Sequence, residues 1–141
     1  MLTIAVDFDG TIVTHEYPRI GKDIPFAIET LLKIQTDFHA CLVLWTVREG
    51  KELAEAVAYC KSRGLEFFAV NNNYPEEKQT DKQPRKLKAD LFIDDRNLGG
   101  LPDWGVIYQM IASGKPLRPL PQELISDYPR VKPSFLKRLF R

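Results

Sequence analysis

The sequence Leu2-Thr3-Ile4-Ala5-Val6-Asp7-Phe8-Asp9-Gly10-Thr11 joins a short apolar run to two acidic residues and a glycine. A β-branched run that ends abruptly in this way predicts a buried strand that delivers its acids to a loop. Because side chains two positions apart on a strand point to the same side, Asp7 and Asp9 are predicted to face one pocket while Phe8 faces the core. Taken alone, an Asp beside a glycine is equally typical of an ordinary turn or cap.

Strand-like and helix-like patterns alternate through the rest of the chain up to Gly114. Short apolar runs are typical of buried parallel strands, and apolar residues at helical spacing are typical of helices that cover a sheet. Asp23 and Asp103 are predicted as helix N-caps. The elements expected after the first strand are strands at 40–45, 65–70 and 89–93 and helices at 24–36, 49–63 and 104–114. Their alternation predicts an α/β fold with a parallel sheet covered on both faces.

Length and composition favour a single domain. A chain of 141 residues, 44% of them hydrophobic, is long enough for one substantial core and too short for two ordinary domains. Residues 1–114 carry a net charge of −4, and residues 115–141 carry a net charge of +5. We therefore distinguish a body at 1–114 from a basic, proline-containing tail at 115–141, which is either part of the same domain or mobile. An acidic body suits a cation site, and the default interpretation of the tail is a solvated one.

The sequence has no feature that indicates a membrane or secretory protein. No apolar run reaches the roughly 18 residues that a membrane span needs. The first residues lead straight into a strand and do not resemble a signal sequence. Cys41 and Cys60 lack the spacing of metal ligands and are interpreted as buried, reduced thiols. These features predict a cytoplasmic protein with no membrane partner.

Acids and a hydroxyl stand at the ends of three predicted strands. Asp7 and Asp9 follow the first strand, Thr46 the second, and Asp94 and Asp95 the fourth. Because the carboxyl ends of parallel strands share one edge of a sheet, these side chains are expected to converge. Clustered carboxylates repel one another unless a cation lies between them, and oxygen ligands without Cys or His favour Mg²⁺. Each feature alone would be an ordinary turn or strand end, but together they predict a magnesium site.

In these motifs and their order, the sequence resembles the haloacid dehalogenase-like (HAD) superfamily of phosphoryl-transfer enzymes. The resemblance covers residues 2–97 and says nothing about the tail. Asp7 to Thr11 match the family's Asp-x-Asp-Gly-Thr pattern, and Thr46 matches its Ser/Thr after the second strand. The family's Lys is matched by a residue in Arg85-Lys86-Leu87-Lys88, and its final acids are matched by Asp94-Asp95.

The resemblance implies a fold and a phosphatase mechanism. The fold would be a three-layer α/β/α, Rossmann-like catalytic domain at 1–114 without a separate cap domain, because the intervals that hold caps in the family are short here. Asp7 would be the nucleophile that forms an aspartyl-phosphate, and Asp9 the general acid that protonates the leaving oxygen and then activates water. Mg²⁺ would be held by Asp7, by the backbone carbonyl of Asp9, and by Asp94 and Asp95, with Asp94 favoured as the direct ligand.

The resemblance also implies which residues hold the phosphate. Thr46 would donate a hydrogen bond to a phosphoryl oxygen, and a Lys would pair with the same group. Lys86 stands in the favoured register, and Lys88 is kept as the alternative. Gly10 and Thr11 would turn the chain away so that both acids of the motif reach one phosphate.

A site without a cap would be open, so the partner expected is a phosphorylated substrate of unspecified size. Tyr17-Pro18-Arg19 is a candidate for closing over the site, as are the tail and a neighbouring subunit of a homo-oligomer. The basic tail leaves a nucleic-acid phosphate open as a substrate, but it supports this partner only weakly.

Two other functions stay open on the sequence alone. A receiver-like phospho-acceptor switch also gathers acids, a hydroxyl and a Lys, but the order of the motifs here disfavours it. A catalytically silent binding module would keep the same fold. Among the remaining polar and aromatic residues, His15 is interpreted as a loop residue, Arg96 as solvated or structural, and Trp104 and Tyr108 as core.

Overall fold

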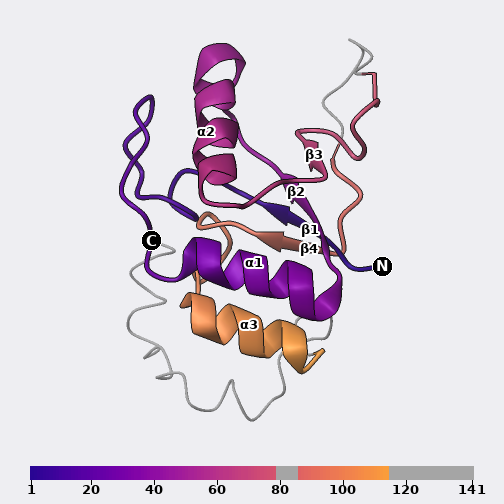
Figure 1. Ribbon diagram of the computed structural model, residues 1–141. Coiled ribbons are helices and arrows are strands. Elements are labelled where there is room, and N and C mark those ends of the chain that lie inside the picture. Colours follow the sequence, from indigo (N-terminus) through magenta and orange to yellow (C-terminus); the bar gives the residue numbers. More distant parts are fainter. Residues whose placement is uncertain (79–85, 115–141) are drawn as a thin grey trace, which may run out of the picture.

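The computed structural model describes residues 1–78 and 86–114, and this part of the chain forms one sheet with three helices (Figure 1). The predicted elements occur in the predicted order, although the third strand is shorter than expected. The predictions made for the tail and for residues 79–85 lie outside the described residues. The elements are β1 (Thr3–Val6), α1 (Ala27–Phe38), β2 (Cys41–Leu44), α2 (Gly50–Ser62), β3 (Ala69–Val70), β4 (Leu91–Ile93) and α3 (Trp104–Ala112).

The four strands of the described chain are all parallel, in the order β3-β2-β1-β4. Val6, the last residue of β1, is level with Leu44 of β2 on one side and with Ile93 of β4 on the other. The arrows of β1 and β4 accordingly point the same way in Figure 1. The carboxyl ends of three strands therefore lie at one edge, which confirms an α/β fold with a parallel, Rossmann-like sheet.

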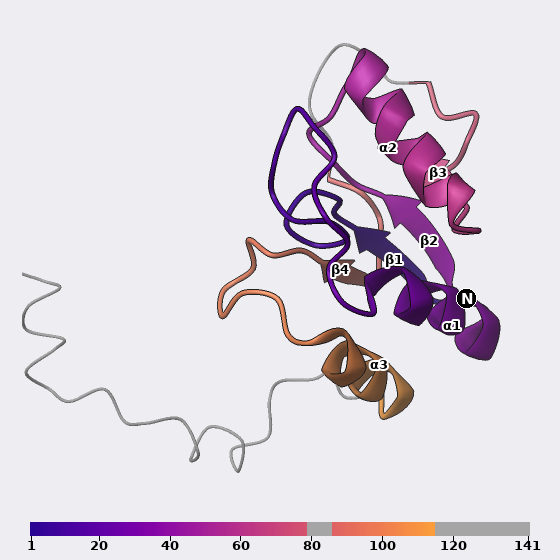
Figure 2. The same cartoon turned by 60° about the vertical axis from the view of Figure 1, so that its left-hand side comes forward.

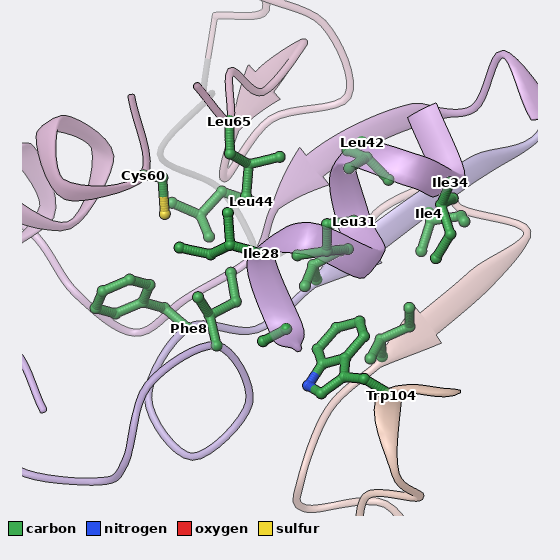
Figure 3. Packing of buried hydrophobic residues seen from close by; sticks show 14 of the residues in the cluster. Ile4, Phe8, Ile28, Leu31, Ile34, Leu42, Leu44, Cys60, Leu65 and Trp104 are labelled. Carbon is green, nitrogen blue, oxygen red and sulfur yellow. The ribbon is translucent and has the colours of Figure 1, made fainter. Parts of the chain in front are cut away.

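The two faces of the sheet bury different residues because side chains alternate along each strand. Ile4 and Val6 of β1 face a core that takes residues from all three helices, including Leu31 of α1, Cys60 of α2 and Trp104 of α3 (Figure 3). Burying one such aliphatic side chain contributes roughly 1.5–3 kcal/mol, so this larger core holds the helices to the sheet. The opposite face carries a smaller cluster that consists of Ala5, Val43, Ala69 and Leu87.

Helices α1 and α3 lie side by side, as both views show (Figures 1 and 2). The ring of Phe38 in α1 packs against that of Tyr108 in α3, and the Tyr108 hydroxyl donates a 2.6 Å hydrogen bond to Asp37. Trp104 is buried, as predicted, and the half-buried Tyr108 packs against the same core. Trp104, the first residue of α3, contacts the loop that follows β1 through the carbonyl of Thr11.

The prediction that Asp23 caps the first helix is wrong. Asp23 forms an antiparallel bridge with Val13, so residues 12–24 make a hairpin-like excursion after β1. Helix α1 begins only at Ala27, after Phe26 has turned the chain in the left-handed conformation with φ 66°. Bridge formation with a distant residue overrides the local capping preference of an Asp.

The two cysteines are free thiols, as the sequence predicts. Cys60 is buried and Cys41 is half-buried. Burial raises the pKa of the Cys60 thiol to about 12, so this group stays protonated and unreactive.

Among the helices of the described residues, none combines the length and the apolar character that crossing a membrane requires.

Candidate functional site

Three carboxylates meet where β1 and β4 end. The backbone N–H of Asp7 donates a 3.0 Å hydrogen bond to the carbonyl of Ile93, which aligns the two strand ends. One oxygen each of Asp7, Asp94 and Asp95 lies within 4.8 Å of the others, and all three residues are half-buried. Arg96 donates its backbone N–H to Asp94 Oδ1, while its side chain is exposed. The structure thus brings together three of the four predicted acids.

Thr11 and Gly10 hold the loop after β1 against Asp95. The Thr11 hydroxyl donates to Asp7 Oδ2 at 3.3 Å and accepts a 3.1 Å hydrogen bond from the backbone N–H of Asp95. Trp104 Nε1 donates to the Thr11 carbonyl at 3.2 Å, which links this loop to the core. Gly10 has a φ of 85°, and a Cβ there would lie 2.7 Å from Asp95 Cγ. Only glycine therefore lets the loop come this close to the acids.

Burial, together with the neighbouring acids, raises the pKa of Asp7 from 3.8 to about 7. Burial is the largest cause, and the charges of Asp94 and Asp95 raise the pKa further, against a lowering hydrogen bond from the backbone of Phe8. A divalent cation among the three carboxylates would reverse the electrostatic part of this shift. A set of carboxylate oxygens suits a hard cation, so Asp7, Asp94 and Asp95 are residues that could hold Mg²⁺.

The raised pKa of Asp7 predicts how the stability of the metal-free protein depends on pH. Between the unfolded value of 3.8 and the folded value of about 7, the folded state binds more protons than the unfolded state. The contribution of Asp7 to the free energy of unfolding should therefore fall as pH rises through this window and stay constant above it. We expect the urea midpoint at about pH 8 to rise when Mg²⁺ is added, and to respond less at about pH 4.5.

The control for this pH dependence is Asp7→Asn, which cannot ionise. The difference in pH dependence of stability between wild type and variant gives the contribution of Asp7, separate from the contributions of the other acids. The same pH slope in both proteins, in the absence of metal, would contradict the assignment of the raised pKa to Asp7.

The carboxylate of Asp9 lies apart from this cluster and is bound by Arg48. Arg48 Nε donates to Asp9 Oδ2 and Nη2 donates to Oδ1, each at 2.7 Å. Both side chains are buried, and the hydrogen bonds to Asp9 are the main reason that the pKa of Arg48 is raised. Such a two-point pair is among the stronger and more directional contacts in proteins. Both carboxylate oxygens of the predicted general acid are therefore engaged by one guanidinium.

Sequence patterns did not identify Arg48 as part of the site. It stands two residues after Thr46 at the carboxyl edge of the sheet, and its side chain is 0% exposed. The feature of the sequence that could have indicated its role is its position at the sheet edge where several acids are predicted. A single Arg in a polar loop is more often solvated, so its role could be recognised only once Asp9 was placed next to it.

Thr46 is held in place at the end of β2 by two neighbours. Its backbone N–H donates a 2.8 Å hydrogen bond to Asn71 Oδ1, and its hydroxyl accepts one of 3.2 Å from the backbone N–H of Arg48. Asn71 has a φ of 54°, a conformation that Asn adopts more readily than most residues. A hydroxyl that accepts one bond still has its own proton to donate, so Thr46 can bind an anionic oxygen.

Within the described part of the chain, neither Lys86 nor Lys88 forms an ion pair with the clustered acids. Lys86 Nζ lies 5.3 Å from the centre of the Phe92 ring, and Phe92 packs against the smaller cluster on the opposite face of the sheet. Lys88 donates its backbone N–H to Asn73 Oδ1 at 2.7 Å. Both Lys residues are exposed. Neither candidate Lys is therefore paired with an acid of the cluster in the described residues.

The chain is similar to a solved structure described as that of a conserved protein coded by a locus from Bacteroides thetaiotaomicron. The two sequences are 63% identical, the match covers 81% of this chain and 92% of that chain, and the TM-score is 0.74. No protein-family model and no curated protein matches the chain. Sequence identity of this level over nearly the whole length of the relative shows that the two proteins share a family. The chain belongs to the same family as this conserved Bacteroides thetaiotaomicron protein.

Proposed function

We propose that the protein is a Mg²⁺-dependent phosphatase of the HAD-like superfamily, which hydrolyses phosphomonoesters through an aspartyl-phosphate on Asp7. One observation carries the proposal: carboxylate oxygens of Asp7, Asp94 and Asp95 lie within 4.8 Å of one another at the carboxyl edge of the sheet. The position of Thr46 at the same edge supports it.

The chemistry would divide between the two acids of the motif. A carboxylate oxygen of Asp7 would attack phosphorus as the bond to the leaving oxygen breaks, and that oxygen would take its proton from Asp9. Water would then attack the phosphorus of the aspartyl-phosphate and pass a proton to Asp9, which releases inorganic phosphate and restores Asp7. For each proton transfer, one oxygen of Asp9 would have to leave the two-point pair with Arg48, while the other oxygen stays bound and keeps Asp9 oriented.

The charges around the phosphate would be balanced by groups at the strand ends. When bound by Asp7, Asp94 and Asp95, Mg²⁺ would reduce the repulsion between these acids and an anionic phosphate. Thr46 would donate its hydroxyl proton to a phosphoryl oxygen. Lys86, or Lys88 as the alternative, would have to turn towards the acids to pair with the same phosphate.

The finer architecture also belongs to this proposal: three layers, no separate cap, and a cytoplasmic location. The segment between β1 and α1 holds the hairpin-like excursion at 12–24, and α2 with a short loop fills the segment between β2 and β3. The short length of these two segments supports the proposal that no cap is inserted in them. An open site of this kind accepts phosphorylated substrates of different sizes, including nucleic-acid ends.

A second candidate function is a binding module that holds Mg²⁺ and a phosphate without turnover. Two observations favour it: Lys86 lies over Phe92, and both carboxylate oxygens of Asp9 are bound by Arg48. Such a module would bind inorganic phosphate in the presence of Mg²⁺ but would release none from an ester.

The test is a phosphatase screen on the full chain. Aryl phosphate, sugar phosphates, nucleotides, phosphopeptides and phosphorylated nucleic-acid ends are each incubated with Mg²⁺ or with a chelator, and released phosphate is measured. We expect release that depends on Mg²⁺ and differs among the substrate classes. Phosphate binding by calorimetry without release from any substrate would favour the binding module and contradict the phosphatase.

A further inference from the structure

Arg48 joins three segments that are far apart in the sequence. Besides the two bonds to Asp9, Nη1 donates to the carbonyls of Pro18 at 3.0 Å and Glu52 at 3.4 Å, and Nη2 donates to the carbonyl of Arg19 at 2.9 Å. All five N–H groups of the guanidinium thus have acceptors. A buried cation loses its hydration, so each of these acceptors is needed to offset the cost.

The loop Tyr17-Pro18-Arg19 depends on this guanidinium for its position. All three residues are exposed, and the loop meets Arg48 through two backbone carbonyls and the Tyr17 ring. The guanidinium carbon lies 5.2 Å from the centre of the Tyr17 ring on the loop and 5.0 Å from that of the buried Phe8 ring. Planar stacking and directional bonds allow one orientation of the group, and Asp9 sets that orientation.

We propose that Arg48 is a positioning residue that couples the loop Tyr17-Pro18-Arg19 to Asp9. When Asp9 holds the guanidinium, Arg48 holds the loop next to the site; when that pair is weakened, the loop detaches. Under the proposed function, this coupling would keep the loop beside the acid that serves the leaving group. The effect on turnover rests on the proposed function, whereas the structural coupling does not.

Limited proteolysis tests the coupling without any enzyme assay. Trypsin cleaves after Arg, and the carbonyl of the Arg19–Ile20 bond is the one that Arg48 binds. We expect Asp9→Asn to raise the rate of cleavage at this bond roughly tenfold, because the amide offers the guanidinium one neutral acceptor and replaces the other acceptor with an NH2 group. Cleavage follows the population of the open loop. Mass spectrometry of the 1–19 fragment in short digests measures the rate.

The matched control is Asp94→Asn, which removes a negative charge from the same edge; within the described residues, Asp94 forms no hydrogen bond or ion pair with Arg48. Cleavage at Lys33–Ile34, inside α1 and next to the buried Ile34, serves as an internal reference for unfolding of the whole domain. An unchanged Arg19–Ile20 rate in Asp9→Asn, an equal increase in Asp94→Asn, or an equal increase at Lys33–Ile34 would each overturn the coupling.

Arg48→Lys provides a second variant that keeps the charge and can still pair with Asp9. Lys cannot reproduce the fork of bonds, so we expect faster cleavage at Arg19–Ile20 in this variant too. If the phosphatase is active, its kcat should fall about tenfold while KM changes less than about twofold, since the lost contact orients Asp9 and does not bind phosphate. Wild-type cleavage with a changed KM would overturn the role of Arg48. Absence of activity in the wild type would count against the proposed function alone, because the proteolysis result does not depend on it.

Discussion

Asp7→Asn is expected to lower Mg²⁺-dependent phosphate release at least about a thousandfold, the order of loss that follows removal of a catalytic nucleophile. The amide of Asn has nearly the same shape as the carboxylate, but it is a poor nucleophile towards phosphorus and a neutral ligand for Mg²⁺. At about pH 8 in the absence of metal, the same change should stabilise the fold, because it removes a charge from a half-buried, acidic environment. Released phosphate and the urea midpoint measure the two effects.

A loss of activity together with a gain in stability would separate the chemical role of Asp7 from a structural one. Asp103→Asn is the matched control: Asp103 is exposed, stands before α3 and makes no capping hydrogen bond. This variant should keep wild-type turnover. Turnover by Asp7→Asn at the wild-type rate would remove Asp7 as the nucleophile.

Gly10→Ala is expected to disrupt the acid cluster although it removes no functional group. The new methyl group would overlap the carboxylate of Asp95. Asp95 has little room to move away, because its backbone N–H is bound by the Thr11 hydroxyl and it follows directly on the end of β4. The positive φ of Gly10 adds strain, so the free energy of unfolding should fall by about 3 kcal/mol. Displacing Asp95 from Asp7 should also weaken Mg²⁺ binding, measured by calorimetry.

Gly99→Ala isolates the effect of the clash from that of the backbone. Gly99 has a φ of 86°, close to the 85° of Gly10, but nothing lies within 4 Å of a Cβ at that position. This variant should lose only about 1 kcal/mol of stability and keep its affinity for Mg²⁺. Equal effects of the two substitutions would show that Asp95 does not crowd Gly10.

The strands and helices that could be predicted are those whose pattern is local. The apolar run before Asp7 forms β1, and the residues with helical spacing after Asp103 form α3. Both could be predicted because the pattern of apolar residues within each segment shows which face is buried. The start of the first helix could not be found in this way. Asp23 has the chemistry of an N-cap, but its pairing with Val13 depends on a chain reversal that no local pattern encodes.

The residues of the candidate site likewise fall into those that a local pattern predicts and those that it does not. Asp7, Asp94 and Asp95 could be expected to meet, because parallel strands bring all their carboxyl ends to one edge whatever their separation in sequence. The sequence by itself therefore determined the fold class and the edge at which acids gather. The tertiary structure alone decided that Asp9 pairs with Arg48, and that the loop Tyr17-Pro18-Arg19 shares the same guanidinium. Those contacts are directional hydrogen bonds between residues about 30 to 40 positions apart. Packing around the buried charge of Arg48 selects its partners, and spacing along the chain does not.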